Sequence, residues 1–175
     1  MIAATDILTA AGEVTGLGAE DDPPGRRERY LDLIAWGESE RVRAALARCS
    51  GCALVVRGIL RRIGFDDPEL KARYRMGMAV ADVVAIARRH GAWLPGTTPI
   101  VAGDIVLVGG VGLGGNEHVF VVVDFDGARV TSVDGGQVVR GYQAVLRCSR
   151  PIRVYAGRVM VGSRQVAGVA RFHGS

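Results

Sequence analysis

The chain has 175 residues, and 49% of them are hydrophobic, which suits one folded domain with a sizeable core and argues against disorder. No apolar run approaches the roughly 20 residues of a membrane-spanning helix. The first residues lack a basic segment followed by an apolar one, so we expect no signal peptide. We therefore expect a chain that is synthesised in the cytoplasm and that reaches any extracytoplasmic target by a route without a signal peptide or in association with a phage.

The net charge of +4 does not by itself indicate a nucleic-acid partner. The basic residues are nearly all arginine, and they are dispersed in pairs such as Arg26-Arg27 and Arg61-Arg62. Aromatic residues, at 6%, are too scarce to form a platform for stacked bases. We therefore expect neither nucleic-acid binding nor a membrane span.

Cysteine and histidine are too few and too scattered for a disulfide scaffold or a zinc site. The chain contains Cys49, Cys52, Cys148, His90, His118 and His173. Their spacing matches no structural metal motif. We expect no metal ion and no organic cofactor.

The first half of the chain has the apolar spacing and the punctuation of helices. Tyr30, Leu31 and Ile34 recur at helical spacing, and Asp67-Pro68 has the residue types of a helix start. An acidic loop with Pro-Pro-Gly at 19–25 separates the first two helices. We expect helices to begin near Asp6, Arg26, Ser39, Cys52, Asp67 and Met78.

Beyond Pro95 the pattern changes to short strands with turns between them. Asp126-Gly127 predicts a tight hairpin. Helices followed by hairpin-linked strands indicate an α+β fold with N-terminal helices packed on an antiparallel sheet. The chain has no internal repeat and no linker, so we expect residues 1–175 to form a single domain. We expect strands at 104–108, 118–125, 128–133, 152–155, 159–161 and 166–172.

Cys52 is the residue that says most about function. It directly precedes an apolar run with helix character that ends at Gly64. A thiol in the first turn of a helix lies at the positive end of the helix dipole, where the thiolate is favoured and the thiol pKa falls. His118 opens a later apolar run, and Asp134 follows it by 16 residues. A cysteine on a helix, a histidine on a strand and then a polar orienting group is the order that a papain-like cysteine hydrolase needs.

Two stretches resemble the CHAP amidase and NlpC-type peptidase superfamily, which has a papain-like fold. Residues 51–56, Gly-Cys-Ala-Leu-Val-Val, are similar to the family's nucleophile helix. Residues 102–108, Ala-Gly-Asp-Ile-Val-Leu-Val, look like the family's glycine-aspartate strand signature, and His118 stands where the family's histidine opens the next strand. The segment at 134–137, Asp-Gly-Gly-Gln, is similar to a Gly-Gly-Asn-Gln segment of some members, with Gly136 in place of the asparagine. The resemblance covers roughly residues 45–140.

The resemblance implies a thiol-dependent hydrolase that cleaves amide bonds, usually in the peptide part of peptidoglycan. Cys52 would be the nucleophile and His118 the general base that also protonates the leaving amine. The third catalytic residue would be Asp134, which we favour, or Gln137. The backbone N–H of Cys52 would meet the oxyanion. No cofactor is implied.

Other interpretations of the cysteines stay open at this point. Cys49-Ser50-Gly51 mimics a Cys-Ser-Gly form of the family motif, although that choice separates the cysteine from the apolar helix by two further residues. Cys49 and Cys52 also form a Cys-x-x-Cys pair, but a redox motif of that kind follows a strand, and the preceding segment has helix character. A small buried cysteine without a catalytic role is the commoner situation.

The whole fold has a rival interpretation as well. The same architecture without catalysis would serve as a structural or binding module, associated with a phage or a toxin system. The glycine-rich segment 110–115 satisfies a dinucleotide-binding pattern, but the strand expected after it excludes that site, which requires a helix there. We expect it to form a loop beside the active site instead. Trp36 and Trp93 are expected to fill the core, as are Met76 and Met78.

Overall fold

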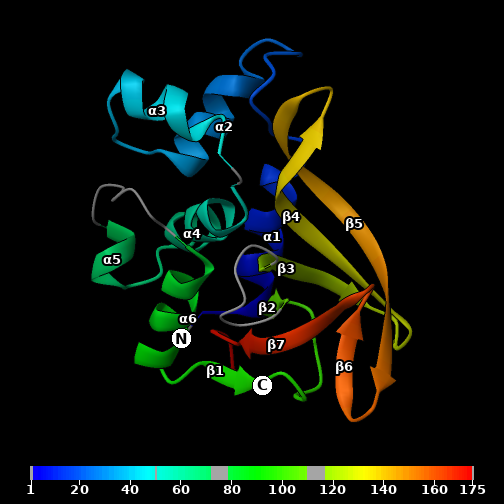
Figure 1. Ribbon diagram of the computed structural model, residues 1–175. Helices are drawn as coiled ribbons and strands as arrows, with labels where there is room; N and C mark the ends of the chain where they lie inside the picture. The colour runs from blue at the N-terminus through cyan, green and yellow to red at the C-terminus, as the bar shows by residue number, and fades with distance from the viewer. Residues whose placement is uncertain (1, 50, 72–78, 110–116, 175) are drawn as a thin grey trace.

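The computed structural model describes residues 2–49, 51–71, 79–109 and 117–174 (Figure 1). Helices occupy the first half of the chain and strands the second. The helices are α1 (Ala4–Val14), α2 (Arg26–Ile34), α3 (Glu40–Leu46), α4 (Cys52–Arg62), α5 (Pro68–Lys71) and α6 (Val80–Arg89). The strands are β1 (Trp93–Pro95), β2 (Ile105–Val108), β3 (His118–Phe125), β4 (Arg129–Val139), β5 (Tyr142–Tyr155), β6 (Arg158–Val161) and β7 (Arg164–Ala170).

Helix α4 lies at the centre of the helical layer. Every residue from Cys52 to Leu60 is buried, so this helix is covered on all sides, unlike an amphipathic surface helix. Helices α1, α2, α5 and α6 pack around it, and it also contacts β3 and β4. Gly58 allows α2 to approach closely, because a Cβ there would lie 2.5 Å from the carbonyl oxygen of Leu33. The helical layer therefore holds α4 firmly against the sheet.

The strands form one antiparallel sheet in the order β1-β7-β2-β3-β4-β5-β6. Strand β6 also pairs with β7, so the six strands from β2 to β7 close into a ring, with β1 added along β7. Figure 1 shows this curled sheet on one side of the molecule and the helices on the other. The expected α+β fold, with N-terminal helices beside an antiparallel sheet, is confirmed.

Alternation along β2 and β3 divides the apolar residues between two cores. Ile105, Leu107, Val119 and Val121 belong to the large core shared with the helices. Their neighbours in sequence face the second core, enclosed by the curled sheet, because successive side chains of a strand point to opposite faces. The second core contains Ile100, Val106, Val108, Phe120, Val122, Val130, Val161, Val166 and Val169.

Three strands differ clearly from the expectation, and one of them, β1, was not expected at all. Strand β4 does not stop at Val133 but continues through Asp134 to Val139, with an irregularity in its pairing with β5 between Asp134 and Gln137. Strand β5 is 14 residues long, whereas only its last four residues were expected. Its many arginines and one proline hide the alternation that identifies a strand.

The structure also bears on several smaller expectations. Trp36 does not fill the core: it is 53% exposed and stacks under the guanidinium of Arg61 at 4.9 Å. Gly51, the neighbour of Ser50, takes the N-cap position of α4. Ser50 itself, the two methionines and the glycine-rich segment 110–115 lie outside the described residues. Among the described helices, none has the length and apolarity that a membrane crossing requires.

Candidate active site

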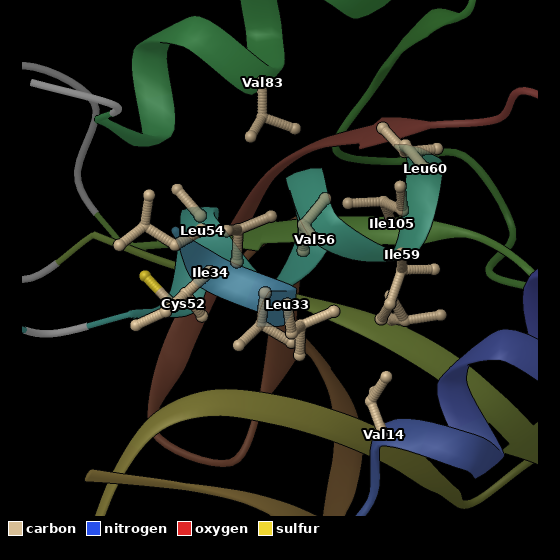
Figure 2. Close-up of a cluster of buried hydrophobic side chains, with 14 of the residues drawn as sticks. Val14, Leu33, Ile34, Cys52, Leu54, Val56, Ile59, Leu60, Val83 and Ile105 are labelled. Carbon is tan, nitrogen blue, oxygen red and sulfur yellow. The ribbon is translucent and has the colours of Figure 1, made fainter. Parts of the chain in front are cut away.

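Cys52 is the first residue of α4. Backbone N–H groups in the first turn of a helix have no acceptor within the helix, so they are directed at whatever lies beyond the N-terminus. The residue is 7% exposed, and Figure 2 shows its sulfur at one edge of the cluster that includes Leu33, Ile34 and Leu54. The position therefore combines a partial positive charge, which favours the thiolate, with burial, which disfavours it.

The irregular part of β4 lies directly against the start of α4. A Cβ at Gly135 would be 2.5 Å from a methyl carbon of Val55 and 2.8 Å from the carbonyl oxygen of Gly51. These distances are too short for any side chain, so glycine is needed for the strand and the helix to meet. Since Asp134 immediately precedes Gly135, this contact also places Asp134 near the N-terminus of α4.

His118 connects the helix to the strand. It is the first residue of β3, and its Nε2 lies 2.6 Å from Oδ2 of Asp134, which is fully buried. A hydrogen bond also links the side chains of His118 and Cys52. Because Asp134 occupies Nε2, the other ring nitrogen, Nδ1, is the one available to the thiol. Cys52, His118 and Asp134 thus form a continuous hydrogen-bonded chain.

Asp134 has further partners that the sequence did not indicate. Arg150 of β5 donates to both carboxylate oxygens, at 3.2 Å to Oδ1 and 2.7 Å to Oδ2. Ser132 donates to Oδ1 at 2.5 Å and accepts a hydrogen bond of 2.9 Å from Arg150. Ser132 and Asp134 are two residues apart and so project from the same face of β4. A buried carboxylate with this many donors stays ionised and fixed in orientation.

The pKa values of Cys52, His118 and Asp134 shift in the directions that favour a thiolate beside an imidazolium. Burial raises the pKa of the Cys52 thiol, but the hydrogen bond with His118, a backbone N–H of Val119 and the imidazolium charge together lower it below its ordinary value. Burial lowers the pKa of His118, but the hydrogen bonds and charges of Asp134 and Cys52 raise it to about 9. For Asp134, burial raises the pKa, and the donors from His118, Arg150 and Ser132 bring it below the usual range.

Gln137, the alternative to Asp134, is placed differently. Its side-chain amide donates to the carbonyl oxygen of Gly135 at 3.4 Å, and it lines a cavity beside His118. The hydrogen bond to the imidazole is made by Asp134.

The other two cysteines are placed differently: Cys148 lies beside Arg150, and its carbonyl oxygen accepts a hydrogen bond of 3.5 Å from Ser132. Cys49 is exposed, and its thiol donates to the carbonyl oxygen of Ala45 at 3.4 Å. Cys148 is half-buried, and burial together with the charge of Asp134 raises its pKa. Cys49 and Cys52 are both free thiols, so no disulfide joins them.

Tyr30 lies next to the site, although the sequence indicated only its helical spacing with Leu31 and Ile34. Its hydroxyl is buried and has no hydrogen-bond partner among the described residues. It lies 3.0 Å from the point that a Cβ on Gly51 would occupy, next to the start of α4. Burial, assisted by the charge of Cys49, raises its pKa to about 12, so the hydroxyl remains a donor. A buried donor without an acceptor is rare in folded proteins, and here it stands beside Gly51, the residue before Cys52.

A cavity of about 560 Å³ opens on the side of His118 that faces β5 and the β6–β7 turn. Its polar walls are formed by Glu117, His118, Gln137, Arg150, Ser163 and Arg164. The described residues contain no group of three or more His, Cys, Asp or Glu that could hold a metal ion.

Comparison with known proteins adds no identification to this geometry. No protein-family model, no curated protein and no solved structure matches the chain.

Proposed function

We propose that this protein is a thiol-dependent amide hydrolase of papain-like architecture, related to the CHAP and NlpC-type enzymes. The observation that carries the proposal is the hydrogen-bonded chain from Cys52 through His118 to Asp134, at the N-terminus of a buried helix. The order of these residues along the chain and the elements that bear them are those of the resembling family. The likeness of the motifs supports peptidoglycan peptide or amide bonds as the substrate.

The catalytic cycle follows from the atoms at the site. The Cys52 sulfur, as thiolate, attacks the carbonyl carbon of the amide, and a C–S bond forms while the carbonyl oxygen becomes an oxyanion. His118 Nδ1 then gives its proton to the amide nitrogen, the C–N bond breaks and the amine leaves. Water, deprotonated by His118, attacks the thioester carbon, and the thiolate departs with its bonding electrons. The products are a carboxylic acid and an amine.

Asp134 and Arg150 support this cycle without exchanging protons. The carboxylate accepts a hydrogen bond from Nε2 of His118, which holds the ring with Nδ1 toward the sulfur and stabilises the imidazolium. Arg150 and Ser132 donate hydrogen bonds to the Asp134 carboxylate, which keeps it ionised and fixes its orientation. Two donors suit the oxyanion: the backbone N–H of Cys52 and the hydroxyl of Tyr30, whose missing partner would arrive with the substrate.

The proposal is tested by incubating the protein with purified muropeptides and analysing the products by mass. The wild type is expected to add one water across an amide bond. Cys52→Ala is expected to lose at least about a thousandfold in rate while keeping its fold, because it removes the nucleophile. Cys49→Ala serves as the matched control and retains activity. Full activity in Cys52→Ala would contradict Cys52 as the nucleophile and move that role to Cys49. No cleavage by the wild type of any muropeptide or simple peptide amide would instead favour a catalytically silent binding module.

A further inference from the structure

The β6–β7 turn brings an arginine to the cavity beside His118. Val161 and Arg164 are paired across the turn, with Gly162 and Ser163 at its tip. Gly162 packs near Arg150, since a Cβ there would lie 3.7 Å from Cδ of that side chain. Ser163 and Arg164 line the same cavity as His118 and Gln137.

The two arginines that line the cavity differ in their ion-pair partners. Arg150 is bound to Asp134 and Ser132, so most of its charge is already balanced. Arg164 is exposed, and the described part of the chain gives it no ion-pair partner. A guanidinium is planar, permanently charged and suited to bind a carboxylate through two parallel hydrogen bonds. The Ser163 hydroxyl and the half-buried Gln137 amide supply further donors to the same space.

The cavity also contains a negative charge. Glu117 immediately precedes His118 and forms part of the wall. The cavity as a whole therefore does not attract anions uniformly. A negatively charged ligand group would be attracted to Arg164 and Ser163 and repelled by Glu117.

We propose that Arg164, with Ser163 and Gln137, forms a subsite that binds a carboxylate of a peptide substrate, so that the enzyme prefers acidic peptides. This inference rests on the proposed function, because it assigns the cavity next to His118 to the substrate of that same site. The subsite positions the peptide and takes no part in bond breaking. It makes Arg164 a residue that determines specificity.

Binding to Cys52→Ala protein tests the subsite without requiring turnover. The probes are three blocked tripeptides, acetylated and amidated, in which glutamate occupies the first, second or third position between alanines. Each has a counterpart with glutamine in place of glutamate, which keeps the shape and removes the charge. Affinities are measured by titration calorimetry. We expect at least one acidic peptide to bind about tenfold more tightly than its neutral counterpart, as a charge-assisted hydrogen bond provides.

Matched arginine variants identify the residue responsible. In the Cys52→Ala background, Arg164→Gln is expected to remove the preference for the acidic peptide. Arg158→Gln, which alters an exposed arginine of β6 outside the cavity wall, is expected to keep it. Equal binding of all pairs, absence of binding, or a preference that survives Arg164→Gln would overturn the subsite.

The two proposals fail in different ways. Hydrolysis by the wild type without any preference for acidic peptides would overturn the subsite and leave the hydrolase intact. An acidic preference that depends on Arg164, together with no hydrolysis of any amide, would support the subsite and overturn the enzymatic proposal.

Discussion

Nε2 of His118 and Oδ2 of Asp134 are 2.6 Å apart, and the carboxylate has no exposure to solvent. Because the pKa of Asp134 lies below its usual range, the carboxylate is ionised and accepts, so Nε2 of the imidazole carries the proton and donates. The ring orientation follows from this one bond. It turns Nδ1 toward Cys52 and explains why the pKa of His118 rises to about 9.

Asp134→Ala is expected to reduce kcat more than Gln137→Ala. Asp134 holds the imidazole and stabilises its charge, whereas the Gln137 amide is bonded to Gly135. The loss for Asp134→Ala should approach about a thousandfold or more, the scale seen when the orienting member of a triad is removed. Steady-state kinetics on one amide substrate ranks the two variants. A larger loss in Gln137→Ala would assign the orienting role to the glutamine.

The activity of the wild type is expected to fall as the pH rises through about 9, where His118 loses the proton that it must give to the leaving amine. Asp134→Asn lowers the pKa of His118, because it removes the neighbouring negative charge, so this alkaline limb should move to lower pH. Profiles of kcat/KM against pH for the wild type and for Asp134→Asn locate the alkaline limb of each protein. An alkaline limb that does not move in Asp134→Asn would contradict the assignment.

The free energy of unfolding should also depend on the protonation of His118. The pKa of folded His118, about 9, exceeds its ordinary value of 6.5, so the imidazolium stabilises the fold fully below the unfolded pKa. That contribution is lost as the pH rises through about 9. Chemical denaturation of the wild type and of His118→Ala across this range measures the difference in the free energy of unfolding.

Arg150→Gln is expected to lower the free energy of unfolding by about 2 kcal/mol, because it leaves a buried carboxylate with fewer charged donors. Asp134 stabilises the fold at pH values above its unfolded pKa, and this contribution is lost as the pH falls through the depressed folded pKa. Without Arg150 the folded pKa rises, so acid unfolding should begin at higher pH. Urea denaturation at several pH values measures both effects.

Arg147→Gln is the matched control for this experiment. It alters an exposed arginine of the same strand and should leave stability within about 0.5 kcal/mol of the wild type. Equal behaviour of the two variants would show that the contacts between Arg150 and Asp134 contribute nothing.

Gly135→Ala is expected to lower both stability and activity. Its Cβ would meet Val55 and the carbonyl oxygen of Gly51, so either β4 or the N-terminus of α4 has to move, at a cost of about 1–3 kcal/mol. A shift of α4 displaces Cys52 from His118, so kcat should fall further than the loss of folded protein explains. Gly12→Ala, in a helix with open space around its Cα, is the control and should be neutral or slightly stabilising.

Local patterns predicted the elements that carry the site. The apolar run after Cys52 was sufficient to place a helix there, and the run after His118 was sufficient to place a strand. The separation between Asp134 and His118 suited a hairpin, which the structure contains as β3 and β4. These are features of short segments, where residue spacing along the chain determines the secondary structure.

Contacts between distant segments escaped prediction. Arg150 reaches Asp134 because β4 and β5 pair in a register that includes an irregularity, and no local pattern reveals that register. The helical spacing of Tyr30 predicted a helix there, and the structure buries this side chain. The position of Tyr30 beside Gly51 depends on how α2 packs against α4. This packing cannot be predicted from the local sequence.

The reactivity of Cys52 toward iodoacetamide tests the central claim most directly. Because the pKa of Cys52 is lowered and that of Cys148 is raised, Cys52 should be alkylated faster near neutral pH, by about tenfold for each unit that separates the two pKa values. His118→Ala should remove most of this advantage, since the hydrogen bond and the charge of the imidazolium favour the thiolate. Mass spectrometry of peptides from a time course gives the rate at each cysteine. Equal rates at Cys52 and Cys148, or a fast rate at Cys52 that His118→Ala leaves unchanged, would contradict a thiolate activated by this histidine.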